Sequence, residues 1–81
     1  MVARVGQMGY TRIDGEKIRQ LREDRALSTR DLAALSDVSS FTINQAEIGK
    51  RSRVQPRTLR KLAQALNVLP RELMVREDDE L

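Results

Sequence analysis

Residues 28–49 read STRDLAALSDVSSFTINQAEIG, and this stretch decides the fold. It contains two short helical patterns, each opened by a capping residue. Ser28 precedes the first pattern and can accept a hydrogen bond from a free amide of its first turn, while Asp31 complements the helix dipole. Ser39 precedes the second pattern, and Gly49 ends it with the positive φ that helix ends favour. Because the turn between the helices is short, they must cross steeply, and the second helix is left projecting.

The second helix of this helix-turn-helix arrangement has one apolar face. On a wheel of 100° per residue, Ile43 and Ala46 share the side that we predict to be buried. The opposite side carries Ser40, Phe41, Asn44 and Gln45. Phe41 could enter the core only if the helix turned and exposed Ile43. The other interpretations of Phe41 are contact with a thymine methyl group or with a neighbouring protein.

Helical patterns also flank this stretch. Asp14 can cap a helix that directs Ile18 and Leu21 inward. In the helix after Ser28, the residues predicted to face inward are Leu32, Ala33 and Leu35. We expect a loop from residue 48 to residue 55.

The clearest amphipathic pattern of the chain follows that loop. Pro56 suits the first turn of a helix, and apolar residues then recur at helical spacing, at Leu59, Leu62, Ala63 and Leu66. Asn67 can end this helix in the left-handed conformation. A short fifth helix is predicted from Pro70, with Leu73 and Met74 facing either the core or a dimer partner.

The chain is divided by these patterns into one domain and two tails. Residues 13–75 form the predicted domain, and residues 76–81 form an acidic tail that we expect to be disordered. Residues 1–12 read as a flexible arm, either a frayed terminus or a basic arm that follows DNA through Arg4 and Arg12. No long apolar run occurs in residues 1–13, so the sequence predicts no signal peptide or membrane span, and a cytoplasmic protein.

Composition excludes several classes of function. The 81 residues contain no Cys and no His, so neither a disulfide nor a thiolate metal site can be built. No calcium loop or Gly-rich phosphate loop appears, and no nucleophile–base pair can be assembled by spacing. We therefore expect no metal, no cofactor and no enzymatic activity.

Positive charge is concentrated in one segment. The net charge is only +3, but residues 50–61 carry six basic side chains and no acidic one. These residues are Lys50, Arg51, Arg53, Arg57, Arg60 and Lys61. Because the segment directly follows the projecting helix, it favours a polyanionic partner at that helix.

From about Asp14 to Met74 the sequence resembles the XRE-like helix-turn-helix regulators of the lambdoid-repressor and Cro type. The resemblance lies in four phrases in the correct order, IRQLRE (residues 18–23), LSTRDLA (27–33), VSSFTINQAEIGK (38–50) and TLRKLAQALNV (58–68). Three positions depart from the family pattern: Thr29 stands for a usual Gln, Asp37 for a frequent Gly, and Ala46 for a longer aliphatic residue. The resemblance implies an all-α fold, a compact bundle of about five helices. It also implies an ion pair between Arg22 and Glu47; the alternative is that Arg22 extends to solvent.

Sequence-specific DNA binding is the activity that this resemblance implies. Gln and Asn can bond adenine bidentately, so the base-reading set would be Ser39, Ser40, Phe41, Asn44 and Gln45. The set that would hold phosphates is Thr29, Lys50, Arg51, Arg53 and Arg57. Such a protein is expected to bind a palindromic operator as a homodimer and to repress transcription. The candidate dimer contacts are Leu69, Leu73 and Met74. The alternative is an antitoxin-type module that neutralises a partner protein and also binds its own promoter.

Overall fold

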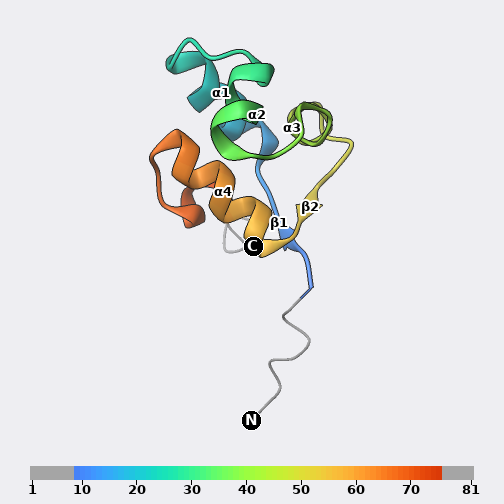
Figure 1. The fold of residues 1–81 in the computed structure, drawn as a ribbon. Helices are drawn as coiled ribbons and strands as arrows, with labels where there is room; N and C mark the ends of the chain where they lie inside the picture. Colours follow the sequence, from blue (N-terminus) through green and yellow to red (C-terminus); the bar gives the residue numbers. More distant parts are fainter. Residues whose placement is uncertain (1–8, 76–81) are drawn as a thin grey trace.

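The computed structural model describes residues 9–75, in which short helices predominate (Figure 1). Its elements in chain order are β1 (Thr11–Arg12), α1 (Gly15–Asp24), α2 (Thr29–Ser36), α3 (Ser40–Glu47), β2 (Arg53–Val54), α4 (Pro56–Leu66) and the 3-10 helix η2 (Pro70–Leu73). The predicted fold class is confirmed, but the expected count of five helices is slightly wrong. The fifth helix is a single 3-10 turn, because Met74 leaves it to pair with Ile13 in an isolated β-bridge.

Capping residues set the starts of the first three helices as predicted. The Asp14 carboxylate accepts a hydrogen bond from the Lys17 amide at 3.2 Å, and the Ser39 hydroxyl accepts one from the Thr42 amide at 3.0 Å. At α2 the bonding is reciprocal, since Ser28 Oγ accepts from the Asp31 amide and Asp31 Oδ2 accepts from the Ser28 amide. This capping box satisfies two backbone donors that would otherwise lack partners.

Residues with positive φ end three of the elements. Asp37 ends α2 at φ 63°, Asn67 ends α4 at φ 61°, and Gly49 follows α3 at φ 85°. All three positions were expected from their residue types. Ala26, between α1 and α2, also has positive φ at 55°, which nothing in its residue type indicates.

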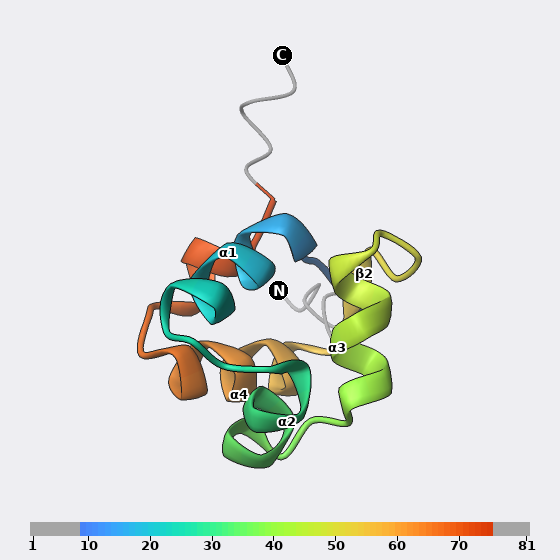
Figure 2. The ribbon, with the colours of Figure 1, turned by 90° about the horizontal axis from the view of Figure 1, so that it is seen from above.

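The core lies where α1, α2, α3, α4 and η2 meet (Figure 2). Its buried apolar residues are Ile13, Ile18, Leu32, Val38, Ile43, Ala46, Val54, Leu59, Leu62, Ala63, Leu66 and Leu73. The amphipathic pattern of α4 is therefore confirmed at each predicted position, and Leu21 and Ala33 pack partly buried against the core.

Leu35 was predicted to face inward, and this prediction is wrong because its side chain is 60% exposed. The buried stripe of α2 runs through Leu32 and Ser36 instead. Leu35 lies about 100° from Ser36 on the helix wheel and so turns toward solvent.

A small antiparallel sheet joins two segments that are far apart in the chain. Thr11 of β1 lies opposite Val54 of β2, and Arg12 lies opposite Arg53. The predicted flexible arm, residues 1–12, therefore extends too far, because Thr11–Arg12 form a strand. The predicted loop, residues 48–55, likewise contains the strand Arg53–Val54. Strands of two residues show no alternating pattern, so only the tertiary pairing reveals them.

The predictions about Arg4 in the arm and about the acidic tail fall on residues 1–8 and 76–81, outside the described residues. Arg12, the other basic residue of the predicted arm, lies in β1. Between residues 9 and 75, none of the helices has the length and apolar character needed to cross a membrane.

Candidate nucleic-acid interface

The turn between α2 and α3 determines how α3 projects from the molecule. The Asp37 amide bonds the Ala33 carbonyl at 2.8 Å, and the left-handed Asp37 then redirects the chain. Buried Ser36 accepts a hydrogen bond from the Val38 amide at 3.2 Å, while the Val38 side chain enters the core. The hydrogen bonds of the Asp37 and Val38 amides hold the turn in place. As a result, α3 lies at one side of the molecule, away from η2 (Figures 1 and 2).

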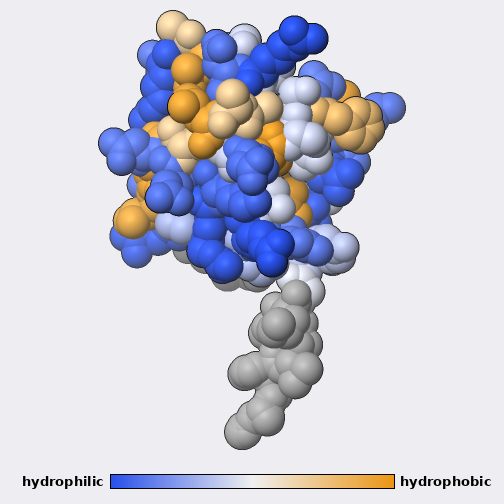
Figure 3. Space-filling model, in the orientation of Figure 1, coloured by the Kyte–Doolittle hydropathy of each residue, from blue (hydrophilic) through white to orange (hydrophobic). Residues whose placement is uncertain are grey.

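The outward face of α3 is polar apart from one aromatic ring. Ile43 and Ala46 are buried, whereas Ser39, Phe41 and Asn44 are exposed and Ser40 and Gln45 are half-buried. Phe41 is 65% exposed, so the interpretation that places it in the core is wrong. Figure 3 shows a group of hydrophobic atoms at the outer edge of α3 and a mostly hydrophilic surface over α4.

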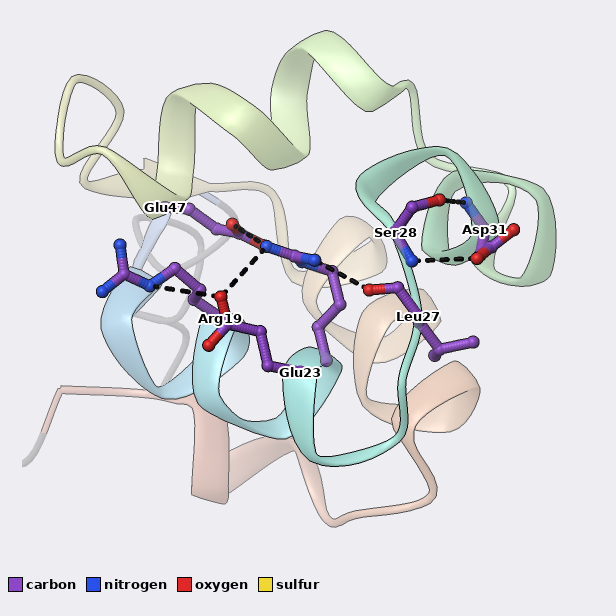
Figure 4. Close-up of polar contacts among 7 residues, drawn as sticks. Arg19, Glu23, Leu27, Ser28, Asp31 and Glu47 are labelled. Carbon is purple, nitrogen blue, oxygen red and sulfur yellow. Dashed lines mark hydrogen bonds and ion pairs between the residues drawn. The ribbon is translucent and has the colours of Figure 1, made fainter.

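An ion pair fixes the end of α3 to α1. Arg22 Nε and Nη2 donate to the two carboxylate oxygens of Glu47 at 2.7 and 2.9 Å, and Arg22 Nη1 donates to the Leu27 carbonyl at 2.7 Å (Figure 4). The two side chains are only 12% and 5% exposed. The hydrogen bond to Glu47 raises the pKa of Arg22 above its ordinary value, against the opposing effect of burial. The pair expected from the resemblance is formed, and Arg22 does not extend to solvent.

A glycine lets α1 and α3 approach closely. A Cβ atom at Gly15 would lie 1.8 Å from the Ala46 carbonyl oxygen, so only glycine fits against this backbone. The contact involves only backbone atoms of Ala46 and Glu47 and therefore leaves no pattern in the side chains of α3. The role of Gly15 itself was missed, since a glycine at the start of a helix has many possible explanations.

Basic residues surround the end of α3. The amides of Lys50 and Arg51 both donate to the Gln45 carbonyl, at 2.9 and 3.0 Å, so the chain turns back across the helix end. Four of the predicted phosphate-binding side chains are exposed here, Lys50, Arg51, Arg53 and Arg57. The fifth, Thr29, is half-buried in the first turn of α2.

Carboxylates are almost missing from this part of the chain. Between residues 40 and 70 the only acidic residue is Glu47, and its charge is neutralised by Arg22. Lys61 differs from Lys50 and Arg51 because its Nζ atom lies 3.5 Å from Oδ2 of Asp37, with which it forms an ion pair. No group of carboxylates in residues 9–75 is arranged to hold a metal ion. The arrangement can therefore offer hydrogen bonds and positive charge to a polyanion.

Tyr10 joins this surface and was not predicted to do so. It is exposed and contributes to a hollow of about 170 Å³ beside α3. The hollow is lined by Tyr10, Thr42, Arg51, Val54, Gln55 and Thr58. The pairing of β1 with β2 places Tyr10 here, and no local pattern in the sequence indicates it.

The candidate dimer contacts separate into two groups. Leu69 is exposed, and Met74 is more than one-third exposed. Leu73 has no exposed surface and packs in the core, so its predicted contribution to a dimer contact is wrong. The side chain turns inward because it is the buried position of the 3-10 turn that closes the core beside α1 and α4.

Comparison with known proteins gives a consistent result. A family model described as a helix-turn-helix domain matches residues 15–76. The HTH-type transcriptional repressor RghR of Bacillus subtilis (strain 168) is 46% identical over 54 residues, which cover 67% of this chain and 40% of that protein. The chain thus spans about two-fifths of the length of the curated relatives it matches.

Solved structures share the fold. The restriction-modification controller protein C.AhdI from Aeromonas hydrophila is 38% identical, with a TM-score of 0.68 over 74% of this chain and 89% of that one. The biofilm regulator SinR, solved in complex with DNA, is 22% identical and has a TM-score of 0.70 over 73% of this chain and 94% of that one, a likeness of fold alone. As its resemblance to the lambdoid-repressor and Cro type predicted, the chain belongs to the family of XRE-like helix-turn-helix domains.

Proposed function

We propose that this protein binds a specific sequence of double-stranded DNA as a homodimer and represses transcription by occluding a promoter. The observation that carries this proposal is the outward face of α3, which presents Asn44 and Gln45 beside exposed basic residues and no free carboxylate. A face of this kind matches the edges of base pairs in a major groove between two phosphate backbones.

The residues divide into two roles. The side chains of α3 read base edges, with Gln45 and Asn44 suited to bidentate bonds with adenine and Phe41 suited to a thymine methyl group. Ser39 and Ser40, at the start of the helix, complete the base-reading set. Phosphates are held by Thr29, Lys50, Arg51, Arg53 and Arg57, which set the position of the protein on the duplex without reading its sequence.

Dimerisation follows from the size of this interface. One short recognition helix gives little affinity, so two half-sites about one helical turn apart are expected on a palindromic operator. The exposed Leu69 and Met74 are the residues we propose for the dimer contact. Both lie near the η2 end of the molecule, away from α3 (Figure 2).

Salt dependence of binding tests the division of roles. A phosphate contact releases counterions, and each contributes about 0.9 to the slope of log affinity against log salt concentration. Arg57→Ala should therefore weaken binding to specific and random duplexes equally and reduce the slope by about 0.9 per monomer. Gln45→Ala should lower affinity for the specific duplex alone, by about 1–3 kcal/mol, and leave the slope unchanged.

Arg71→Ala provides the matched control, since it removes the same charge from η2 on the side of the molecule away from α3 (Figures 1 and 2). Equal slopes for Arg57→Ala and Arg71→Ala would contradict the proposed phosphate contacts. If the wild-type protein bound no duplex at all, the antitoxin-type alternative would replace this proposal.

A further inference from the structure

A second large apolar side chain is exposed at the end of α3. Ile48 is 55% exposed, although it directly follows the last residue of the helix. Ile48 is the C-cap residue, and its φ of −89° and ψ of 4° are no longer those of an α-helix, but its amide still bonds the Asn44 carbonyl at 3.0 Å, four residues back, as helical residues do. The side chain of Ile48 therefore continues the helix wheel of α3.

On this wheel Ile48 shares a stripe with Phe41. Ile48 is seven positions after Phe41. Seven positions rotate the helix by about 20° less than two full turns and advance it by about 10.5 Å along its axis. Asn44 lies between them on the same side. The outward stripe is thus polar at its centre and apolar at both ends.

The charges around Ile48 decide what can cover it. Glu47, its neighbour in the chain, points into the molecule and is neutralised by Arg22. The turn after Ile48 brings exposed Lys50 and Arg51 back to the Gln45 carbonyl. An apolar surface of a protein would have to bury these charges without partners, at high cost. DNA places apolar methyl groups in the major groove and negative phosphates at its rims, which fits an isoleucine flanked by basic residues.

We propose that Ile48 is a second specificity-determining residue, which contacts the C5 methyl group of a thymine. The contact is separate from the one assigned to Phe41. Because about 10.5 Å separates Phe41 from Ile48 along α3, the two side chains reach two different thymines. This inference rests on the proposed DNA-binding function and extends it to a requirement for two thymines in each half-site.

Replacement of thymine by uracil tests the inference, because it removes only the methyl group. The wild-type protein, Ile48→Ala and Phe41→Ala are measured against an operator selected from random DNA, with each thymine replaced by uracil in turn. At each of two positions uracil should weaken wild-type binding about fourfold, the effect expected from the loss of one buried methyl group. One of the two positions is contacted by Ile48 and the other by Phe41. Ile48→Ala should be insensitive to uracil at the first position, and Phe41→Ala at the second.

Leu35→Ala is the matched control, since it also truncates an exposed apolar side chain but on α2, where Leu35 lines a hollow with residues of α4. It should keep the complete wild-type response to uracil. If Ile48→Ala also kept that response at every thymine, or if the half-site contained no second thymine, the inference would be overturned while DNA binding stood. If wild-type protein selected no DNA, both the inference and the proposed function would fail.

Discussion

At the scale of single residues, the ion pair of Arg22 and Glu47 is the main polar contact of the fold. Arg22 donates two hydrogen bonds to the Glu47 carboxylate, and both side chains have little access to water. A charge left alone in such a place loses its hydration without compensation. Removal of one partner of a buried pair typically costs about 3–5 kcal/mol, a large share of the stability of a small domain.

Glu47→Ala should therefore lower the free energy of unfolding by about 3–5 kcal/mol, measured by urea denaturation. Glu23→Ala is the matched control. The Glu23 carboxylate also pairs with Arg22, with 4.0 Å between Oε2 and Nη2, but the side chain of Glu23 is 60% exposed. An exposed pair is worth less than about 1 kcal/mol. Equal, small effects of the two substitutions would contradict the importance of the buried pair.

The stability of the start of α2 depends on pH through the Asp31 carboxylate. The hydrogen bonds from the backbone and then from the hydroxyl of Ser28 lower the pKa of Asp31 below its ordinary value. The folded state therefore binds this proton less readily than the unfolded state. The stabilisation is complete above the ordinary aspartate pKa of about 3.9 and is lost as the pH falls through the lower pKa of the folded state.

Asp31→Asn should consequently be less stable than the wild type at pH 7, and the difference should shrink as the pH is lowered below about 4. Thermal melts at several pH values measure this change. A stability difference that stayed constant from pH 7 to pH 2 would show that the Asp31 charge does not contribute through the capping box.

At the scale of elements, the position of α3 depends on its contact with α1. The backbone of Ala46 leaves no room for a Cβ atom at Gly15. Gly15→Ala should push α3 away from α1, destabilise the fold by about 1–3 kcal/mol and weaken DNA binding. Thermal melts and binding to a selected operator measure the two effects.

Gly49→Ala is the control for this prediction. A Cβ atom at Gly49 meets nothing within 4 Å, but φ of +85° makes any other residue strained there. This substitution should cost about 1–2 kcal/mol through the backbone alone. A Gly15→Ala variant that kept wild-type stability would show that the two helices can separate without penalty.

The elements differ in how far the sequence could predict them. Helix starts at Asp14, Ser28 and Ser39 were predictable because each is determined by a capping side chain. The start of α4 was predictable because Pro56 suits the first turn of a helix. The outward face of α3 was also predictable, since a wheel depends on local geometry alone. Leu35 was assigned wrongly because the buried stripe of α2 passes through Ser36, a polar residue that an apolar pattern does not select.

Contacts between distant segments were beyond local patterns. The sheet of β1 and β2 buries Ile13 and Val54, and neither strand is long enough to alternate. The sequence left Leu73 facing either the core or a dimer partner. Only the packing of η2 shows that the side chain lies in the core. Tyr10 lies at the candidate interface because β1 pairs with β2, a contact between segments far apart in the chain.

At the scale of the whole molecule, the interface and the proposed dimer contact lie on different sides. Substitution of Leu69 by Glu should therefore weaken self-association and lower the affinity for a two-half-site duplex, without unfolding the protein, because the side chain is exposed. Sedimentation equilibrium and binding at several protein concentrations measure this. Leu35→Glu is the control, and an unchanged association constant for Leu69→Glu would place the dimer contact elsewhere.

The central claim is that α3 reads a specific sequence of DNA. Selection of duplexes by the purified protein from a random pool, followed by sequencing, tests it most directly. We expect enrichment of a two-fold symmetric site whose half-sites are centred about 10–10.5 base pairs apart. A pool that showed no enriched sequence after repeated rounds would contradict it.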